Sequence, residues 1–455
     1  MCAGQNLRPI SVRFINPLNK YRKKTKCYRL ELNGTPRANY QLNYRTSNNF
    51  KGTYMKKIAK RSGLAGLVTL SLTSYQVSAQ QASPAPATSP APAPVSAEKP
   101  ADPPPPAIFS IGAFDLTGHI DIGYTNLRGA GKFASGVNSR VFDFDRNEIN
   151  LQSIDLQLAS TPENGFGGVL DVTLGKDADT IAAYGTIDKS RGPANGVDKR
   201  ADVTQAFVHY GAGPLTLIAG KFVTLSGAEV IKSAADTNYS RSILFGYAIP
   251  FTHTGVRATY KVSDTLSLIG GVNQGWDALT DTNNDKTIEL SAAFTPDKTF
   301  SLLVTGYSGK ELVSNYPKSK EKGTRNLLDF VATLTVSEQL TLIGNYDYGS
   351  QDSGSAGVGK AKWQGFAGYA NYQINEQWRV SLRGEYFDDK DGYRTGVVQK
   401  WKEATATVAY LPNKNLELRA ELRGDRSDKD AFLKSDLKTL SKTERSFGVE
   451  LLYKF

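Results

Sequence analysis

Hydrophobic and polar side chains alternate with a period of two along many short segments of residues 109–455. Near the end of the chain Leu416, Leu418, Ala420 and Leu422 form one series, and the residues between them are all charged: Glu417, Arg419, Glu421 and Arg423. Successive side chains of a β-strand point to opposite faces, so this pattern predicts strands with one apolar and one charged face. Four charges on one face are too polar for the core of a soluble β-sandwich. Two alternatives remain: a sheet face exposed to water, or a wall between lipid and a water-filled lumen.

Turn signals separate these segments. Pro, Asn, Asp, Ser and Gly accept tight turn geometry, and they occur near residues 161–162, 211–214, 261–265, 295–299, 336–339, 374–377 and 411–415. The later copies recur roughly every 33–41 residues, which also fits a solenoid or a propeller. The segments opposite the turns, however, are long, polar and variable: residues 281–286, 310–325, 351–360 and 426–443.

Short turns on one side and long loops on the other are typical of an outer-membrane barrel. Seven turns, with both chain ends on the turn side, predict an all-β fold: a transmembrane antiparallel up-and-down β-barrel of about 16 strands, with short periplasmic turns and long outer loops. The sequence has no apolar run long enough for a helix that spans a membrane.

The final strand, residues 446–455, alternates up to the last residue. Phe447, Val449, Leu451, Tyr453 and Phe455 share one face, and only Leu452 breaks the polar series of the other face. This ending resembles the C-terminal signature of bacterial outer-membrane barrels, which the barrel assembly machinery reads. The resemblance implies two partners: the barrel assembly machinery and the lipid of the outer membrane. An ordinary last strand of a soluble sheet is the alternative.

The chain before the barrel divides into three segments. Residues 55–79 have a basic head, a short apolar run and a small-residue cleavage site ending at Ala79, as a secretory signal peptide does. Residues 1–54 precede that signal and are interpreted as an over-long translation start or a disordered extension. Residues 80–107 are rich in Pro and Ala and predict a periplasmic linker, either a passive spacer or a contact to the cell wall. The barrel occupies residues 108–455, and the predicted location is the outer membrane of a Gram-negative bacterium.

The formal charge of +11 does not indicate a nucleic-acid partner. The excess of basic residues lies in the first 79 residues, and from residue 80 onward about 40 bases face about 43 acids. The two cysteines, Cys2 and Cys27, both fall within residues 1–54, so the exported chain has no thiol for a disulfide or a metal.

A long connection at residues 224–251 is less polar than its neighbours, which indicates that it packs against another surface. It lies either inside the barrel, where it would narrow the pore, or over the outer rim. In the first case its charged side chains join those of the wall as pore-lining candidates. The full set is Glu229, Lys232, Asp236, Arg241, Arg379, Arg383, Glu385, Glu417, Arg419, Glu421, Arg423 and Glu450.

Three segments in and beside this connection carry a family resemblance: GKFVTLSGAEVI (220–231), NYSRSILFG (238–246) and PFTHTGVR (250–257), together with Arg146 and Asn147. In them residues 111–455 resemble the β-barrel porin-2, or OmpL-like, family of bacterial outer-membrane porins. The resemblance implies a porin-like channel and no catalytic residues. We therefore expect passive diffusion of small hydrophilic solutes or ions through a polar lumen, with a homo-oligomer as one possible assembly.

Catalytic, cofactor and metal signals are weak. His119, His209 and His253 lack the spacing of metal ligands, and the acidic segment at 281–285 lacks the glycine and the final acid of a calcium loop. We predict no cofactor, no metal and no enzymatic activity. Two alternatives to the channel remain: a barrel that acts as an adhesin or cell-wall anchor, and a membrane-embedded hydrolase with a Ser–His pair.

Overall fold

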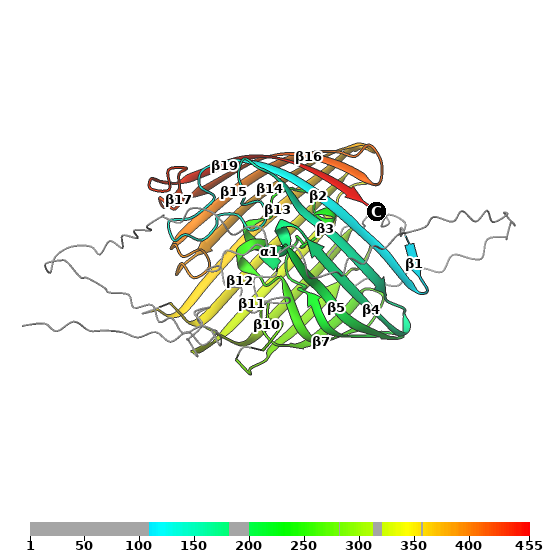
Figure 1. Cartoon of the computed structure of the whole chain (residues 1–455). Coiled ribbons are helices and arrows are strands. Elements are labelled where there is room, and N and C mark those ends of the chain that lie inside the picture. The colour runs from blue at the N-terminus through cyan, green and yellow to red at the C-terminus, as the bar shows by residue number, and fades with distance from the viewer. Residues whose placement is uncertain (1–108, 182–199, 282, 313–320, 356–357) are drawn as a thin grey trace, which may run out of the picture. The chain divides into compact units, whose positions relative to one another are not determined.

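The computed structural model describes residues 109–181, 200–281, 283–312, 321–355 and 358–455. Residues 1–54, the expected signal peptide (55–79) and the expected linker (80–107) lie outside these residues. The described chain is almost entirely β-structure (Figure 1). Its long strands are β2 (Phe114–Arg128), β3 (Ile149–Ser160), β4 (Asn164–Leu174), β5 (Ala201–Ala212), β6 (Leu215–Val223), β7 (Thr252–Lys261), β8 (Leu266–Asn273), β9 (Thr287–Phe294), β10 (Phe300–Leu312), β11 (Lys322–Thr335), β12 (Leu340–Ser355), β13 (Val358–Asn375), β14 (Trp378–Asp389), β15 (Gln399–Tyr410), β16 (Leu416–Ser427) and β19 (Thr443–Lys454).

These sixteen strands form one closed antiparallel barrel, because each pairs with its two neighbours and β19 pairs with β2. The closing register places Lys454 opposite His119 and Arg445 opposite Arg128. Phe455 extends the seam: its N–H donates to the Gly118 carbonyl at 2.9 Å, and its own carbonyl accepts from Gly118 N at 2.8 Å. The predicted fold class, strand number and pairing of the last strand with the first are confirmed.

Seven short turns join the strands at one end of the barrel, at residues 161–163, 213–214, 262–265, 295–299, 336–339, 376–377 and 411–415. Side chains of turn residues hold several of them closed. The Asp297 carboxylate accepts from Thr299 N at 2.7 Å, and the Asn413 side chain accepts from Asn415 N at 3.0 Å. Such local bonds explain why these residue types end one strand and start the next.

Longer connections lie at the other end, among them residues 129–148, 224–251, 274–286, 390–398 and 428–442. One expected loop is wrong. Residues 351–360 belong largely to β12 and β13, which stay paired as far as Asp352 opposite Lys360 and again at Ser355 opposite Val358. Polar residues therefore extend these two strands beyond the apolar band instead of forming a free loop.

Strand phase separates the two faces of the wall as the alternation predicts. Glu417, Arg419 and Arg423 point inward and are at most 4% exposed, whereas the outward Leu422 is 63% exposed. Exposed aromatic residues lie near the turns on the outer face, where an interfacial girdle is expected: Tyr210, Tyr260, Tyr372, Trp378 and Tyr453.

Small elements within the connections complete the described chain. These are α1 (Lys176–Ile181), the 3-10 turn η2 (Ser233–Ala235), the π-helical turn η3 (Leu244–Ala248) and a hairpin of β17 (Phe432–Leu433) with β18 (Leu440–Ser441). A short strand β1 (Phe109–Ile111) pairs with the start of β2. Among the described residues, no helix has the length and apolar character needed to cross a membrane.

Candidate functional site

The connection between β6 and β7, residues 224–251 and hereafter loop 3, lies inside the barrel. Its residues bond to inward-facing side chains of strands around the wall: Gly227 N to Asp329 of β11, Thr237 to Asn371 of β13, and Asn238 to Thr407 of β15. Of the two arrangements that the sequence allows, the structure has the loop in the lumen. Inward-facing side chains of β11, β13 and β15 all bond to this one loop.

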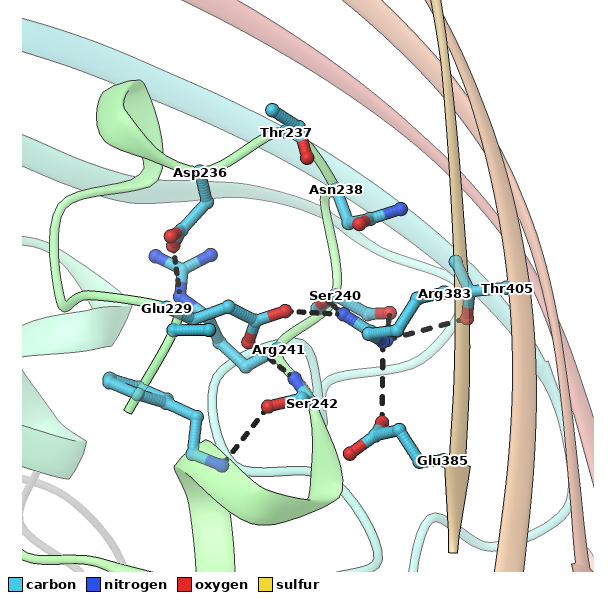
Figure 2. A network of polar contacts seen from close by, with 12 residues as sticks. Glu229, Asp236, Thr237, Asn238, Ser240, Arg241, Ser242, Arg383, Glu385 and Thr405 are labelled. Carbon is cyan, nitrogen blue, oxygen red and sulfur yellow. Dashed lines mark hydrogen bonds and ion pairs between the residues drawn. The ribbon is translucent and has the colours of Figure 1, made fainter. Parts of the chain in front are cut away.

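Arg383 of β14 is the central contact between the wall and loop 3 (Figure 2). Its guanidinium donates to Glu229 Oε1 at 2.7 Å and to the Ser240 carbonyl at 2.6 Å. On the wall side it lies 3.2 Å from Glu403 and 3.3 Å from Glu385. An arginine offers five donors in a planar fork, so one residue can join two loop segments to two strands.

Other wall arginines hold loop carbonyls in the same way. Arg419 of β16 donates to the Asp236 carbonyl at 2.6 Å, and Arg423 donates to the Arg241 carbonyl at 2.6 Å. Arg419 is balanced in the wall by Glu450 at 2.8 Å and by Glu417 at 2.7 Å. Arg379 also pairs with Glu417.

Wall glutamates complement these contacts by accepting from loop amides. Glu385 accepts from Ile243 N at 2.8 Å and from Leu244 N at 3.2 Å, and Glu421 accepts from Tyr239 N at 2.8 Å. Both the carbonyl and the amide groups of this irregular segment thus find charged partners. Buried backbone polar groups must be satisfied, so the alternating Arg and Glu residues of β14 and β16 allow a loop without regular structure to lie within the bilayer span.

Loop 3 is also braced internally and against strands β3 and β4. Arg241 lies 3.0 Å from Asp236 and donates to the Ile231 carbonyl at 2.7 Å. Asp177 of α1 is a second carboxylate beside it, and burial raises the pKa of Asp177 and of Asp236 to about 7 while the guanidinium of Arg241 opposes both shifts. Arg241 is therefore the cation shared by two buried carboxyl groups. Lys232 bridges Asp155 of β3 at 2.9 Å and Asp171 of β4 at 3.0 Å, on the strands that follow β19 and β2 around the barrel.

Tyr239 fits a slot made by two glycines. Its hydroxyl receives a hydrogen bond from Gln152 at 3.0 Å and lies 3.0 Å from Thr125 Oγ1. A Cβ built on the inward-facing Gly123 or Gly448 would come within 2.6 Å of the Tyr239 ring or hydroxyl. Glycine at these neighbouring positions of β2 and β19 is thus what admits the ring.

An apolar cluster surrounds the loop on the side of its π-helical turn. Ile243, Leu244 and Phe245 are at most 2% exposed, and they pack with inward-facing aromatic side chains of the wall, Trp363, Phe387 and Trp401. Trp363 Nε1 donates to the Ala248 carbonyl at 3.0 Å. Sequence reasoning missed this cluster by treating apolar residues as lipid-facing. The alternation along the strand could have shown that Trp401 faces inward, because it falls in the same series as the polar residues Glu403, Thr405 and Thr407.

The twelve candidate pore residues all project into the lumen or belong to loop 3. Eleven of them form one connected region between loop 3 and strands β14–β19, while Lys232 reaches β3 and β4. All eleven are at most 9% exposed, because they contact one another and the loop more than water. Their observed contacts are those of a loop anchor.

The three histidines do not meet. His119 lies beside Ser153 and Asp155, His253 stacks on Tyr307 with ring centroids 4.6 Å apart, and His209 lies near the turn end of β5. No group of three potential metal ligands occurs in the described part of the chain.

A closed sixteen-stranded barrel with an apolar outer face, a polar inner face and a long loop folded into its lumen defines an outer-membrane channel of the porin type, and not an enzyme. The family model described as "Putative beta-barrel porin-2, OmpL-like" matches residues 113–455. The chain belongs to this family.

Solved structures agree on the fold. The outer-membrane channel DcaP of Acinetobacter baumannii is 15% identical, with a TM-score of 0.52 over 77% of this chain and 100% of that one. An anion-selective porin from Comamonas acidovorans is 13% identical, with a TM-score of 0.54 over 75% and 99% of the two chains. A trimer form of OmpT of Vibrio cholerae is 13% identical, with a TM-score of 0.51 over 75% and 99%. No curated protein matches the chain.

Proposed function

We propose that this porin-like channel passes small hydrophilic solutes or ions by passive diffusion, and that loop 3 sets the width of the path. The observation that carries the proposal is the anchoring of loop 3 to inward-facing Arg383, Arg419 and Arg423, which holds a long segment across the lumen. A loop held by several buried charge-assisted bonds restricts the bore permanently, whereas a loop on the rim would leave it wide.

Half-exposed polar side chains support a vestibule on the turn side of loop 3. They face inward on strands β3 to β10 and carry amide or hydroxyl groups: Gln157, Thr216, Thr259, Ser267 and Ser301. Such neutral groups replace part of a solute's hydration without binding it strongly, as diffusion requires. In this proposal the solute enters along that half of the wall and passes beside loop 3.

Single-channel recording tests the proposal. Purified folded protein added to a planar lipid bilayer is expected to give discrete conductance steps, small for a sixteen-stranded barrel because loop 3 occupies the lumen. The Lys298→Gln variant, changed at an exposed turn, is the matched control and should give the same steps. Protein that runs as a folded barrel on gels yet gives no steps would remove the channel proposal and favour an adhesin or anchor.

Orientation makes a second prediction. We propose that the short turns face the periplasm and the long connections face outward, in keeping with the asymmetry of the two ends. An epitope tag inserted at Lys390 or Asp430, exposed residues of two long connections, should be labelled on intact cells, and a tag at Asp297 or Asn413 should be labelled only after the outer membrane is permeabilised. Labelling of the turn-end tags on intact cells would reverse the orientation.

Assembly into a homo-oligomer is part of the same proposal. The OmpT structure described as a trimer form shows that a barrel of this fold can trimerise. Here the outer face of the wall is the surface that a second copy would contact.

A further inference from the structure

Four basic side chains face outward, toward lipid, near the loop end of adjacent strands. Lys402 of β15 is directly opposite Arg426 of β16, and Arg445 of β19 is directly opposite Arg128 of β2. Arg426 and Arg445 are diagonal neighbours, because the register pairs Arg426 with Thr443 and Gly424 with Arg445. All four are exposed. We call them the basic row.

Like charges directly opposite each other on one face of a sheet destabilise it, and the basic row contains two such pairs side by side. Within the described residues none of its four side chains is paired with a carboxylate. Most other arginines of the wall face inward and have acidic partners there: Arg257, Arg379, Arg383, Arg419 and Arg423. An outward row of cations at this place is therefore complementary to an anion that is not part of the chain.

The depth of the row matches a lipid headgroup. On β15 the outward Tyr410 packs against Trp378 near the turns, with ring centroids 4.8 Å apart, and marks one interface. Lys402 lies eight residues further along the same strand, which is about 26 Å of strand and roughly 20 Å along the bilayer normal for a strand tilted by about 40°. Because the apolar band of such barrels is about 25 Å tall, the backbone of the row lies about 5 Å short of the opposite interface, and the long Lys and Arg side chains can reach the headgroups from there.

An apolar groove leads from the row toward the middle of the wall. Its floor is a cross-strand line of residues with little or no side chain, Gly384, Ala404 and Gly424, and Leu382 and Leu422 stand beside it. The cavity measures about 550 Å³, and Arg445 is among its lining residues. A Cβ built on Gly384 or Gly424 meets no atom within 4 Å, so the groove is open.

We propose that the basic row and this groove bind one anionic lipid, whose phosphorylated headgroup lies on Lys402, Arg426 and Arg445 and whose acyl chain lies in the groove. Arginine forks and lysine ammonium groups suit phosphate oxygens, and the groove continues from Arg445 into the apolar band as an acyl chain continues from its headgroup. Charge complementarity favours a lipid over a second copy docked by the same face, because two basic rows would then meet each other. With the long connections facing outward, the site is in the outer leaflet.

Native mass spectrometry of the detergent-solubilised protein tests the proposal. The probes are dimyristoyl phosphatidic acid and dimyristoyl phosphatidylcholine, which have the same chains, and inorganic phosphate. The wild type should retain one phosphatidic acid in preference to phosphatidylcholine. The double variant Arg426→Gln/Arg445→Gln should bind it about 30-fold more weakly, since each basic residue near an anionic lipid contributes separately. The double variant Lys298→Gln/Lys414→Gln, at exposed turns, is the matched control and should bind as the wild type does.

Gly424→Leu separates the two halves of the site. Its Cβ meets no atom within 4 Å and the rest of the side chain extends into the groove, so heat-modifiable gel mobility should show a folded barrel, while phosphatidic acid retention should fall with the basic row intact. Equal retention of the two lipids, equal binding by the two double variants, or inorganic phosphate competing fully with the lipid would overturn the proposal. A change of oligomeric state in Gly424→Leu with lipid retention unchanged would also overturn it and assign the groove to a subunit contact.

Discussion

Replacing Arg383 by alanine is expected to release the middle of loop 3 and to raise the single-channel conductance severalfold. Arg383 joins Glu229 and the Ser240 carbonyl of the loop to Glu385 and Glu403 of the wall. Without the guanidinium Glu229 and Glu385 remain buried with no ion-pair partner within 4 Å among the described residues, whereas Glu403 keeps Arg423 at 3.8 Å. Removing one partner of a buried charge pair costs about 3–5 kcal/mol. The loop can leave the wall and hydrate the freed charges, whereas the barrel keeps its strand ladder.

Conductance in planar bilayers measures this effect, and heat-modifiable gel mobility confirms that the barrel is folded. Arg426→Ala is the matched control, because it removes an arginine from the outer face and leaves loop 3 untouched. Arg383→Lys should fall between the wild type and the alanine variant, since it keeps the charge and loses the fork. A folded Arg383→Ala barrel with unchanged steps would show that loop 3 does not control the bore.

The wall could be predicted because its rules are local. The alternation of Leu418 and Leu422 with Arg419 and Arg423 fixes which face meets lipid, and turn residues such as Asp297 and Asn413 fix where strands end. Given those two rules, the strand number follows from counting the turns. The barrel must close because an open sheet edge is unstable in the membrane, so the pairing of residues 446–455 with the first long strand could also be predicted from the sequence.

The interior could not be predicted in detail, because its contacts join residues far apart in the chain. The candidates of loop 3 and of the wall were named as pore-lining charges, but nothing in the sequence shows that Arg383 reaches the Ser240 carbonyl or that Arg419 reaches that of Asp236. Phe387 and Trp401 break the rule that apolar residues face lipid, because an irregular loop with its own apolar side chains needs an apolar surface inside the barrel. Inward glycines such as Gly448 carry no signal until Tyr239 is seen against them.

Removal of Phe455 is expected to abolish most assembly of the barrel into the outer membrane. The residue closes the seam through two backbone bonds with Gly118, at 2.8 and 2.9 Å, and its ring lies against Gly118 on the outer face. Deletion removes the bonds and the ring together. Phe455→Asp keeps the backbone bonds, replaces the interfacial aromatic with a charge and, by the resemblance of this ending to outer-membrane barrels, removes the signal that the assembly machinery reads.

The measurement is the fraction of the protein in outer-membrane preparations that migrates as a folded barrel before boiling and shifts after it. Both Phe455 variants should lose most of that band, and Phe455→Asp shows whether the loss needs the backbone bonds to be broken. Glu450→Gln is the matched control in the same strand, because its side chain faces inward and glutamine can still accept from Arg419, now 2.8 Å from Glu450. It should assemble normally and alter only conductance. Full assembly without Phe455 would make residues 446–455 an ordinary closing strand, and equal loss in Glu450→Gln would mean that the band reports general damage to β19 instead of the terminal aromatic.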